Sequence, residues 1–306
     1  MKRGFSLIEV VIVVLIAAAF LLLFAGLVSH SREMSRTISC INNMKQIAQA
    51  IENYQADWKD TPFILAALSP VYIPNPKTFH CPADRSSENS YENFYVNRPL
   101  YEEQARKILL ACPRHFNYTR TVAAYLSYAV DIGHNKKVIL NGTELSPSKF
   151  GQEVFSGVLK FADGTEAKVN EGNAGVLSSF VDNQGKLYSI IYVPEGQSGE
   201  KTEVEVTHQG DSQFEVITPS VIAGVAGTKF VVTVAVTDDE TTTEVAVSEG
   251  KVNTALRAIG KLLALKKGEK VKEKNIRWPD DDGSPGSAVI RRKTIPRKPP
   301  RPRHVY

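Results

Sequence analysis

Residues 10–28 read VVIVVLIAAAFLLLFAGLV, which is nineteen consecutive uncharged and mostly apolar positions. At 1.5 Å per residue a helix of this length spans about 28 Å, close to the thickness of the hydrocarbon core of a bilayer. A secretory signal peptide has a shorter apolar region, and its small-residue cleavage site follows that region. The stretch therefore predicts a transmembrane helix, which extends back to Phe5 and is interrupted only by Glu9.

The residues before this run are basic and include a glycine. The segment Lys2-Arg3-Gly4-Phe5-Ser6-Leu7-Ile8-Glu9 resembles the N-terminus of type IV pilins and type II secretion pseudopilins. The resemblance implies a leader of residues 1–4, cleavage between Gly4 and Phe5 by a prepilin peptidase, and N-methylation of Phe5. It also implies other pilin-like subunits as partners, with Glu9 facing the Phe5 amine of a neighbour, since an unpaired carboxylate in lipid is costly. The residues alone equally allow Glu9 to reach the lipid headgroups.

Charge around the apolar run gives little information on orientation. Lys2 and Arg3 precede it, and Arg32 and Arg36 follow it, so the basic residues hardly distinguish the two sides. The pilin resemblance implies a cytoplasmic leader, a single-pass inner-membrane helix over 5–28, and a body on the periplasmic side that could join a filament.

A helical stripe continues beyond the apolar run. Its spacing of three or four residues predicts an amphipathic stem helix over 29–60 that ends before Pro62; the apolar positions are Met34, Ile38, Ile41, Met44, Ile47, Ile51, Tyr54 and Trp58. The segments Ser39–Gln46 and Phe79–Asp84 are similar to S-C-x-N-N-x-K-Q and F-x-C-P-x-D elements of a large group of prepilin-like proteins. A small α/β head region is expected over 61–135.

Three cysteines leave two kinds of site open. Cys81 and Cys112, each followed by proline, are expected to form a disulfide in an oxidising compartment, worth about 3 kcal/mol in the chain-entropy model. Cys40 lies beside the stem stripe and suits a buried free thiol. The alternative is a zinc site made by Cys81, Cys112 and His115 with either His80 or Asp84. We expect the disulfide, with no metal and no cofactor.

Other candidate sites are weaker. The acidic run Asp280–Asp282 could hold calcium, but it lies among proline and glycine, which favours a solvated run. The glycines at 224 and 227 have the wrong spacing for a phosphate-binding loop. Cys112 and His115 share a turn, but no orienting Asn or Asp is evident, and no convergent acid, base or nucleophile set appears elsewhere. The sequence therefore predicts a protein that is not an enzyme.

The second half of the chain has the pattern of a β domain, predicted over 136–275. Short runs of β-branched and aromatic residues alternate with turn signals such as Asn141-Gly142 and Asp163-Gly164. Strands with no long helix between them favour an antiparallel sandwich or roll. Residues 218–230, TPSVIAGVAGTKF, resemble the core of FecR-like domains, and later motifs extend this resemblance over 210–275. The predicted fold class is thus α+β.

Composition is ordinary for a globular chain of 306 residues, with 42% hydrophobic and 23% charged residues. Residues 291–306 carry seven Lys or Arg, so the net charge of +4 becomes −3 without them. The whole segment 276–306 is predicted to be a disordered tail rich in proline and basic residues. Such a tail could bind an anionic envelope polymer rather than nucleic acid, or could remain solvated without a partner.

Together these patterns favour a pilin-like, membrane-anchored structural protein that presents an exported FecR-like β module. The alternative is an envelope sensor or ligand-binding module that uses the helix only as an anchor.

Overall fold

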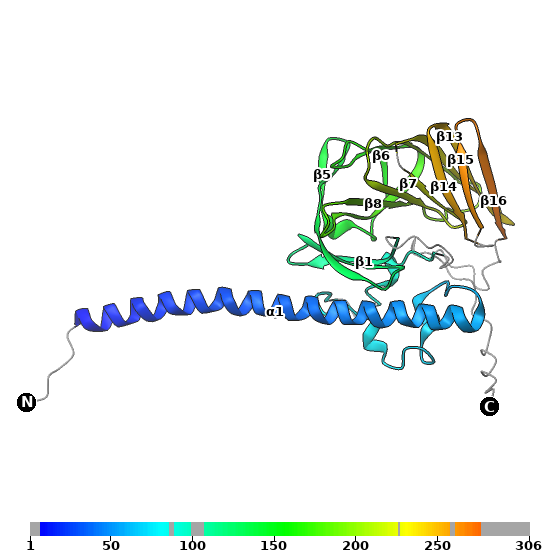
Figure 1. The fold of residues 1–306 in the computed structure, drawn as a ribbon. Helices are drawn as coiled ribbons and strands as arrows, with labels where there is room; N and C mark the ends of the chain where they lie inside the picture. Colours follow the sequence, from blue (N-terminus) through cyan, green and yellow to red (C-terminus); the bar gives the residue numbers. More distant parts are fainter. Residues whose placement is uncertain (1–6, 86–88, 99–106, 226, 258–260, 277–306) are drawn as a thin grey trace, which may run out of the picture.

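The computed structural model describes residues 7–85, 89–98, 107–225, 227–257 and 261–276, and it consists of one long helix carrying a β-rich body (Figure 1). Helix α1 spans Leu7–Trp58. Four short 3-10 helices follow: η1 (Leu65–Leu68), η2 (Pro76–Phe79), η3 (Glu92–Phe94) and η4 (Pro147–Lys149). The α+β class is confirmed.

The strands of the described residues fill the chain from residue 108 to residue 276. Their bounds are β1 (Ile108–His115), β2 (Arg120–Tyr125), β3 (Val130–Asn135), β4 (Val138–Leu140), β5 (Thr143–Leu145), β6 (Phe155–Lys160), β7 (Glu166–Val181), β8 (Leu187–Tyr192), β9 (Lys201–Thr207), β10 (Gln213–Ile217), β11 (Val221–Val225), β12 (Lys229–Val236), β13 (Glu240–Glu249), β14 (Lys251–Leu256), β15 (Lys261–Lys266) and β16 (Lys270–Ile276).

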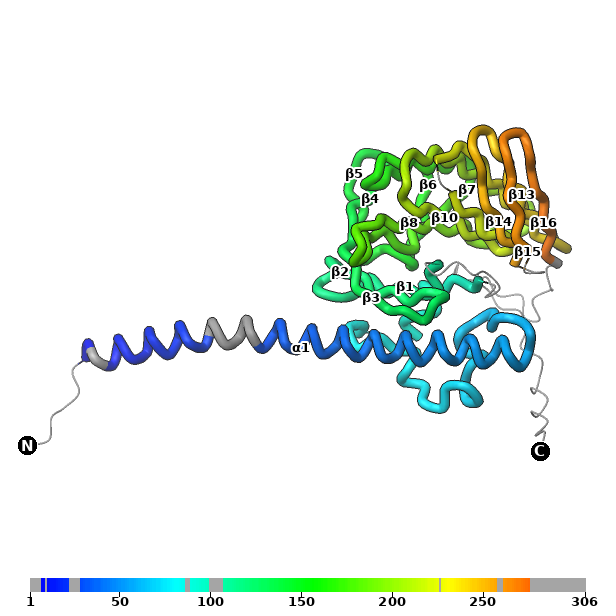
Figure 2. The backbone as a smooth tube through the Cα atoms, viewed as in Figure 1, coloured from blue at the N-terminus to red at the C-terminus, as the bar shows by residue number. Residues whose placement is uncertain are grey.

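Helix α1 is continuous over 52 residues, a length of about 80 Å at 1.5 Å per residue. It ends where Lys59 adopts a positive φ of 57° and Pro62 follows, which agrees with the predicted end. Its N-terminal half extends beyond the body, and its C-terminal half packs against η1, η2 and the strands β1–β3 (Figures 1 and 2). Within the described residues, we find no helix with the combined length and apolarity needed to cross a membrane.

The buried face of the stem differs from the predicted stripe at its start. Met44, Ile47 and Ile51 are fully buried as predicted, but Ile38 is 52% exposed. Thr37 and Cys40 take the inward positions instead and are fully buried. The apolar pattern therefore missed Thr37, a polar residue whose hydroxyl is hydrogen-bonded inside the protein, whereas Cys40 is buried as expected.

Two sheets share the long strand β7. The first sheet has the order β1-β2-β3-β7-β8-β10-β11-β14-β15, and the second has the order β5-β4-β6-β7-β9-β12-β13-β16. Glu166–Glu171 of β7 pairs with β9, whereas Gly175–Val181 pairs with β8. The two sheets are thus joined into one nearly closed β structure.

Two details differ from a purely antiparallel sandwich behind a separate head. Strands β8 and β10 pair in parallel, whereas all other named pairs are antiparallel among the described strands. The strands β1–β3 fall in the predicted head region, yet β3 pairs with β7 of the β domain. Figure 2 shows β1–β3 between α1 and the remaining strands, so the head region continues the first sheet.

The predicted period-two pattern is confirmed in β12. Phe230, Val232, Val234 and Val236 are buried, and the residues between them are half-buried. Because alternate side chains of a strand point to opposite faces, this strand lines the core with one face only.

Candidate functional site

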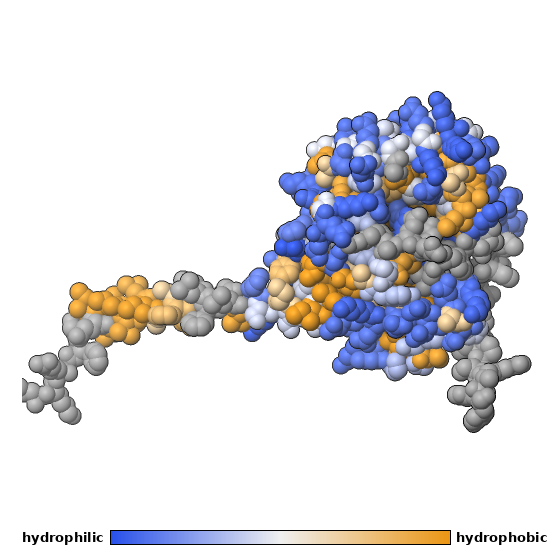
Figure 3. Space-filling model, viewed as in Figure 1, coloured by the Kyte–Doolittle hydropathy of each residue, from blue (hydrophilic) through white to orange (hydrophobic). Residues whose placement is uncertain are grey.

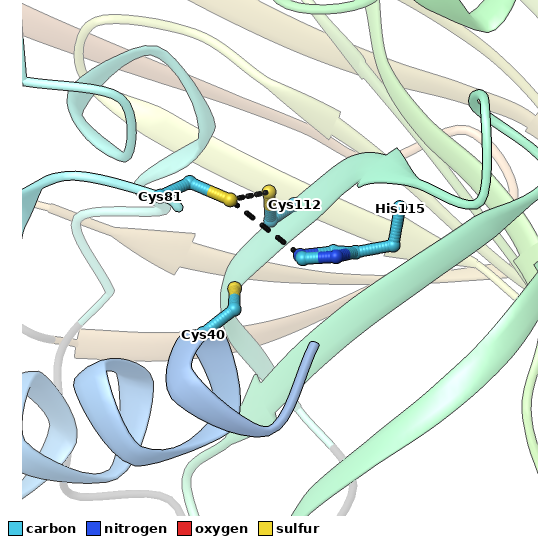
Figure 4. Close-up of side chains that lie close together, drawn as sticks. All are labelled: Cys40, Cys81, Cys112 and His115. Atoms are coloured by element: carbon cyan, nitrogen blue, oxygen red, sulfur yellow. Dashed lines mark hydrogen bonds between the residues drawn. The ribbon is translucent and has the colours of Figure 1, made fainter. Parts of the chain in front are cut away.

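Four metal-ligating side chains from three separate segments meet where the stem contacts the head (Figure 4). Cys40 lies on α1, Cys81 follows η2, and Cys112 and His115 lie on β1. All four residues have 0% relative exposure, and their ligand atoms lie within 4.8 Å of one another. We call Cys40, Cys81, Cys112 and His115 the thiol–histidine cluster.

A bulge in β1 places two of these side chains together. In a regular strand, residues three apart point to opposite faces of the sheet. The pairing of β1 with β2 shifts register between Cys112 and His115, with Pro113 inside the irregular segment. The extra residue brings both side chains to the face that contacts the stem (Figure 4).

The sulfur atoms receive hydrogen bonds from polar donors. The Tyr91 hydroxyl donates to Cys40 Sγ at 3.2 Å, and the Ala83 backbone N–H donates to Cys81 Sγ at 3.4 Å. Burial raises the pKa of Cys112, and a hydrogen bond from the Arg114 backbone opposes this rise only in part. Each sulfur therefore has a donor that favours its thiolate form.

The imidazole of His115 is oriented by the stem helix. The Thr37 hydroxyl donates to the Glu33 carbonyl oxygen at 2.9 Å, and Thr37 Oγ1 lies 3.1 Å from His115 Nδ1. Since that hydroxyl has a single hydrogen, it accepts from Nδ1–H. The Glu33 carboxylate lies 3.5 Å from Nδ1 as well. His115 Nε2 then presents its lone pair toward Cys81 Sγ, 3.5 Å away.

The three thiols strongly affect one another. Hydrogen bonds from Cys112 and Cys40 hold the pKa of Cys81 far below its usual value, whereas burial raises the pKa of both Cys112 and Cys40. By itself the cluster thus favours a single thiolate, because a second negative charge in a buried site is unfavourable. A bound cation would offset the repulsion between thiolates, so that more than one of the three cysteines could be deprotonated.

The structure differs from the predicted disulfide. Cys81 and Cys112 are free thiols whose sulfur atoms lie 3.6 Å apart, compared with about 2.05 Å in a disulfide. Cys40, expected to be an isolated buried thiol, lies beside both. The sequence did not indicate this because Cys40 and Cys81 are 41 positions apart, and only the packing of the stem on the head brings them together.

The fourth ligand of the alternative zinc site also differs from the prediction. His80 Nδ1 lies 3.1 Å from Ser90 Oγ, and an Asp84 carboxylate oxygen lies 3.4 Å from Arg114 Nη1. Neither belongs to the thiol–histidine cluster. Cys40 takes the position that the sequence assigned to one of them.

A second feature is the bare apolar surface at the start of α1. The large hydrophobic residues of its first fifteen positions all have at least 48% of their surface exposed: Leu7, Ile8, Val10, Val11, Ile12, Val13, Val14, Leu15, Ile16, Phe20 and Leu21. Because consecutive positions are exposed, the apolar surface surrounds the helix rather than forming one stripe. Figure 3 shows the described part of this segment as hydrophobic surface that lies away from the body, whose visible face is largely hydrophilic. We call residues 7–21 the apolar rod.

Comparisons with known proteins divide the chain into two matched parts. Residues 156–253 match the FecR protein family. Residues 29–65 match the family described as "Protein of unknown function (DUF1559)". The first match confirms the predicted FecR resemblance but begins upstream of residue 210, within β6, and ends within β14 rather than at residue 275.

Two solved structures are similar to part of the chain. Both are of a "putative anti-sigma factor" from Parabacteroides distasonis, each 20% identical in sequence, with TM-scores of 0.31 and 0.29. In each comparison 41% of this chain is covered, along with 59% or 55% of the other chain, so this chain spans less than two thirds of their length. No curated protein matches the chain.

Of the residues predicted to direct processing and assembly, Gly4 and Phe5 lie outside the described residues. Glu9 lies within α1, and its side chain is outside the described part. The tail over 277–306, including Asp280–Asp282, is also outside it.

Sequence reasoning missed a buried ion-pair network between the head and the FecR-matched strands. Arg98 donates to both carboxylate oxygens of Glu215 and through Nε to the Ile108 carbonyl oxygen at 3.2 Å. Lys107 Nζ lies 2.9 Å from the same carboxylate. Burial alone would raise the pKa of Glu215, but Arg98 and Lys107 lower it to about 2. No local signal marked these residues.

An Asp–His–Ser group in the β domain has an arrangement unlike that of a catalytic triad. The Ser212 hydroxyl donates to Asp163, while His208 Nε2 faces the Ser212 carbonyl oxygen at 3.1 Å. A triad needs the histidine to accept the serine proton and the carboxylate to orient the histidine. Here the carboxylate holds the serine and also accepts from Thr165 N–H at 2.9 Å, which fixes a turn.

Proposed function

We propose that this protein is a pilin-like structural subunit that carries a FecR-like β module on a helical stem. The observation that supports this best is the apolar rod, whose described apolar side chains are all exposed while the C-terminal half of the same helix packs against the body. A contiguous exposed apolar surface of this kind marks a site of contact with lipid or protein.

The apolar rod would contact lipid while the chain is a single subunit in the membrane. After the subunits assemble, it would contact the helices of other pilin-like subunits. Lipid and apolar helices both suit a surface that is hydrophobic around its whole circumference, because neither requires a polar face. A globular partner protein would need only one stripe. We therefore propose a membrane-anchored chain that can pack its rod against other pilin-like subunits.

Processing at the N-terminus belongs to the same proposal. A prepilin peptidase would cut between Gly4 and Phe5 and methylate Phe5, and Glu9 would pair with the amine of a neighbour. Mass spectrometry of the mature chain would then find N-methylated Phe5, whereas an intact Met1 would contradict the processing step.

The β module would be presented outside the membrane by the body. The strands β1–β3 and the Arg98–Glu215 pair connect the stem to the FecR-matched strands. The β module is therefore packed against the stem-bearing part of the chain. In this proposal the body lies on the extracytoplasmic side, and the basic tail over 291–306 contacts an anionic envelope polymer.

Cross-linking tests whether the rods of two copies pack together. We would place a single cysteine at Val13, which is 62% exposed on the rod, and in a matched control at Val71, which is 60% exposed on the body. Mild oxidation of membranes containing each variant should yield covalent dimers for Val13→Cys and few for Val71→Cys. The unmodified chain should remain monomeric because its own cysteines are buried.

The two candidate functions give different results in this test. Monomers from Val13→Cys in membranes, at native expression level, would contradict subunit packing and favour the alternative in which the helix only anchors an envelope sensor or ligand-binding module. The FecR match of residues 156–253 is the observation that keeps this alternative open.

A further inference from the structure

We propose that the thiol–histidine cluster binds one zinc ion, with Cys40, Cys81, Cys112 and His115 as the four ligands, and that this ion clamps the stem helix to the head. This inference does not depend on the proposed function, because it rests only on the cluster itself.

The spacing of the ligand atoms fits tetrahedral coordination. Zinc–sulfur bonds of about 2.3 Å at tetrahedral angles separate two sulfurs by about 3.8 Å, and a zinc–nitrogen bond of about 2.0 Å gives a sulfur–nitrogen separation of about 3.5 Å. The Cys81 and Cys112 sulfurs lie 3.6 Å apart, and Cys81 Sγ lies 3.5 Å from His115 Nε2. Cys40 Sγ is the fourth ligand atom, and it lies within 4.8 Å of each of the other three.

Surrounding groups orient the ligands as in known metal sites. A histidine that ligates a metal usually donates its other ring N–H to an oxygen, which fixes the tautomer. Thr37 Oγ1 and the Glu33 carboxylate are the oxygen atoms next to His115 Nδ1, at 3.1 and 3.5 Å. The Tyr91 hydroxyl donates a hydrogen bond to Cys40 Sγ, and the Ala83 N–H donates one to Cys81 Sγ.

The donor set and its burial favour zinc in a structural role. Three thiolates and one imidazole suit zinc, whereas calcium and magnesium prefer oxygen ligands. Catalytic zinc sites retain an open position for water, but here four protein ligands fill the tetrahedron and all are fully buried. Each thiol that binds as thiolate releases its proton to solvent, so no oxidant or reductant is needed.

The ion would hold together segments that have little regular structure of their own. Between α1 and β1 the described chain contains only the short helices η1, η2 and η3. Zinc would connect this segment, through Cys81, both to α1 through Cys40 and to β1 through Cys112 and His115. Because the site exists only when these three segments are folded together, the free energy of zinc binding would add to the stability of the folded chain.

Metal analysis of the full chain tests the proposal. The chain would be purified in detergent without chelator or an affinity tag of histidines, and zinc would be measured together with protein. We expect about one zinc per chain, with tetrahedral sulfur ligation in the absorption spectrum of the cobalt-substituted protein. Cys40→Ser and His115→Asn should each lose most of the metal. The matched control His80→Gln should retain it, since His80 lies outside the cluster.

A further variant keeps the test valid if ligand variants fail to fold. Thr37→Val preserves all four ligands but removes the nearer of the two oxygens beside His115 Nδ1–H, and it should weaken zinc binding about 10-fold or more in competition with a chelator. Unchanged affinity in Thr37→Val would contradict the assigned orientation of His115.

Other outcomes would overturn the zinc site. These are a Cys81–Cys112 disulfide in the purified chain, full zinc content in Cys40→Ser, or iron in place of zinc. All are independent of the cross-linking at Val13, so failure of the zinc site and failure of subunit packing can be distinguished.

Discussion

Glu215 is a buried carboxylate that is paired with two cationic side chains. Its neighbours Arg98 and Lys107 come from the head region, over a hundred residues earlier in the chain. An isolated buried carboxylate would be protonated, but a paired one remains ionised. Removing one partner of such a pair lowers the free energy of unfolding by more than the intact pair contributes, because the remaining charge stays buried without a partner.

Glu215→Gln should lower the free energy of unfolding by about 3–5 kcal/mol at pH 7, because Arg98 is left buried without its counter-charge. The folded pKa of Glu215, about 2, is below its ordinary value of 4.5. The stabilisation is therefore fully present above about pH 4.5 and is lost as the pH falls toward 2. Denaturant unfolding in detergent at several pH values measures the difference between wild type and variant.

The matched control for this prediction is Glu171→Gln. Glu171 forms an exposed ion pair with Lys201 at 3.1 Å, and exposed pairs contribute about 0–1 kcal/mol. A pH-independent difference between wild type and Glu215→Gln, or an equal effect in both variants, would show that the buried pair is not the source of the stability.

At the scale of elements, β7 decides how the two sheets are joined. It leaves one sheet after Glu171 and enters the other at Gly175, and Gly172 between them has a φ of 71°. A Cβ at residue 172 would lie 2.2 Å from Thr202 Oγ1 and 2.8 Å from the Lys201 carbonyl oxygen. The position thus requires glycine both for its backbone conformation and for space.

Gly172→Ala should therefore destabilise the β domain by more than about 2 kcal/mol, from the positive φ and the contact with the neighbouring backbone together. The control is Gly185→Ala, at a turn with a φ of 80° and no atom within 4 Å of the added Cβ, where only the backbone cost of about 1 kcal/mol applies. Thermal unfolding of both variants measures this. Equal shifts in Tm would contradict the role of close contact at β7.

At the scale of the whole molecule, exposed apolar residues have different expected roles on the rod and on the body. Leu15 is 64% exposed on the rod, and Val71 is exposed to a similar extent on the body. The two positions are thus similarly exposed in the isolated chain. If lipid or other helices cover the rod in the cell, only Leu15 would become buried there.

Leu15→Glu should shift the chain out of the membrane fraction, because a carboxylate within an apolar membrane segment costs about 2.5–3.5 kcal/mol near its centre. Val71→Glu should leave the distribution unchanged. Fractionation of cells expressing each variant, followed by detection of the chain, gives the measurement. Equal partitioning of the two variants would contradict the proposed role of the rod.

The sequence by itself determined those features that depend on neighbours along the chain. The long helix and the strand pattern of β12 follow from local periodicity, and the motif Thr218–Phe230 was found by its resemblance to FecR-like domains, so none of the three needed knowledge of packing. The FecR match confirmed the last of these, although its start at residue 156 was missed because the motifs that carried the resemblance begin only at Thr218.

Only the tertiary structure decided which distant residues meet. Cys40 was assigned no partner, Cys81 and Cys112 were assigned to each other, and Thr37 was not considered, yet all surround His115 once the stem packs on β1. The bulge between Cys112 and His115 and the pairing of β3 with β7 depend on backbone register between segments far apart in sequence. Contacts of this kind are set by packing of the whole chain, and a single sequence has no local pattern that records them.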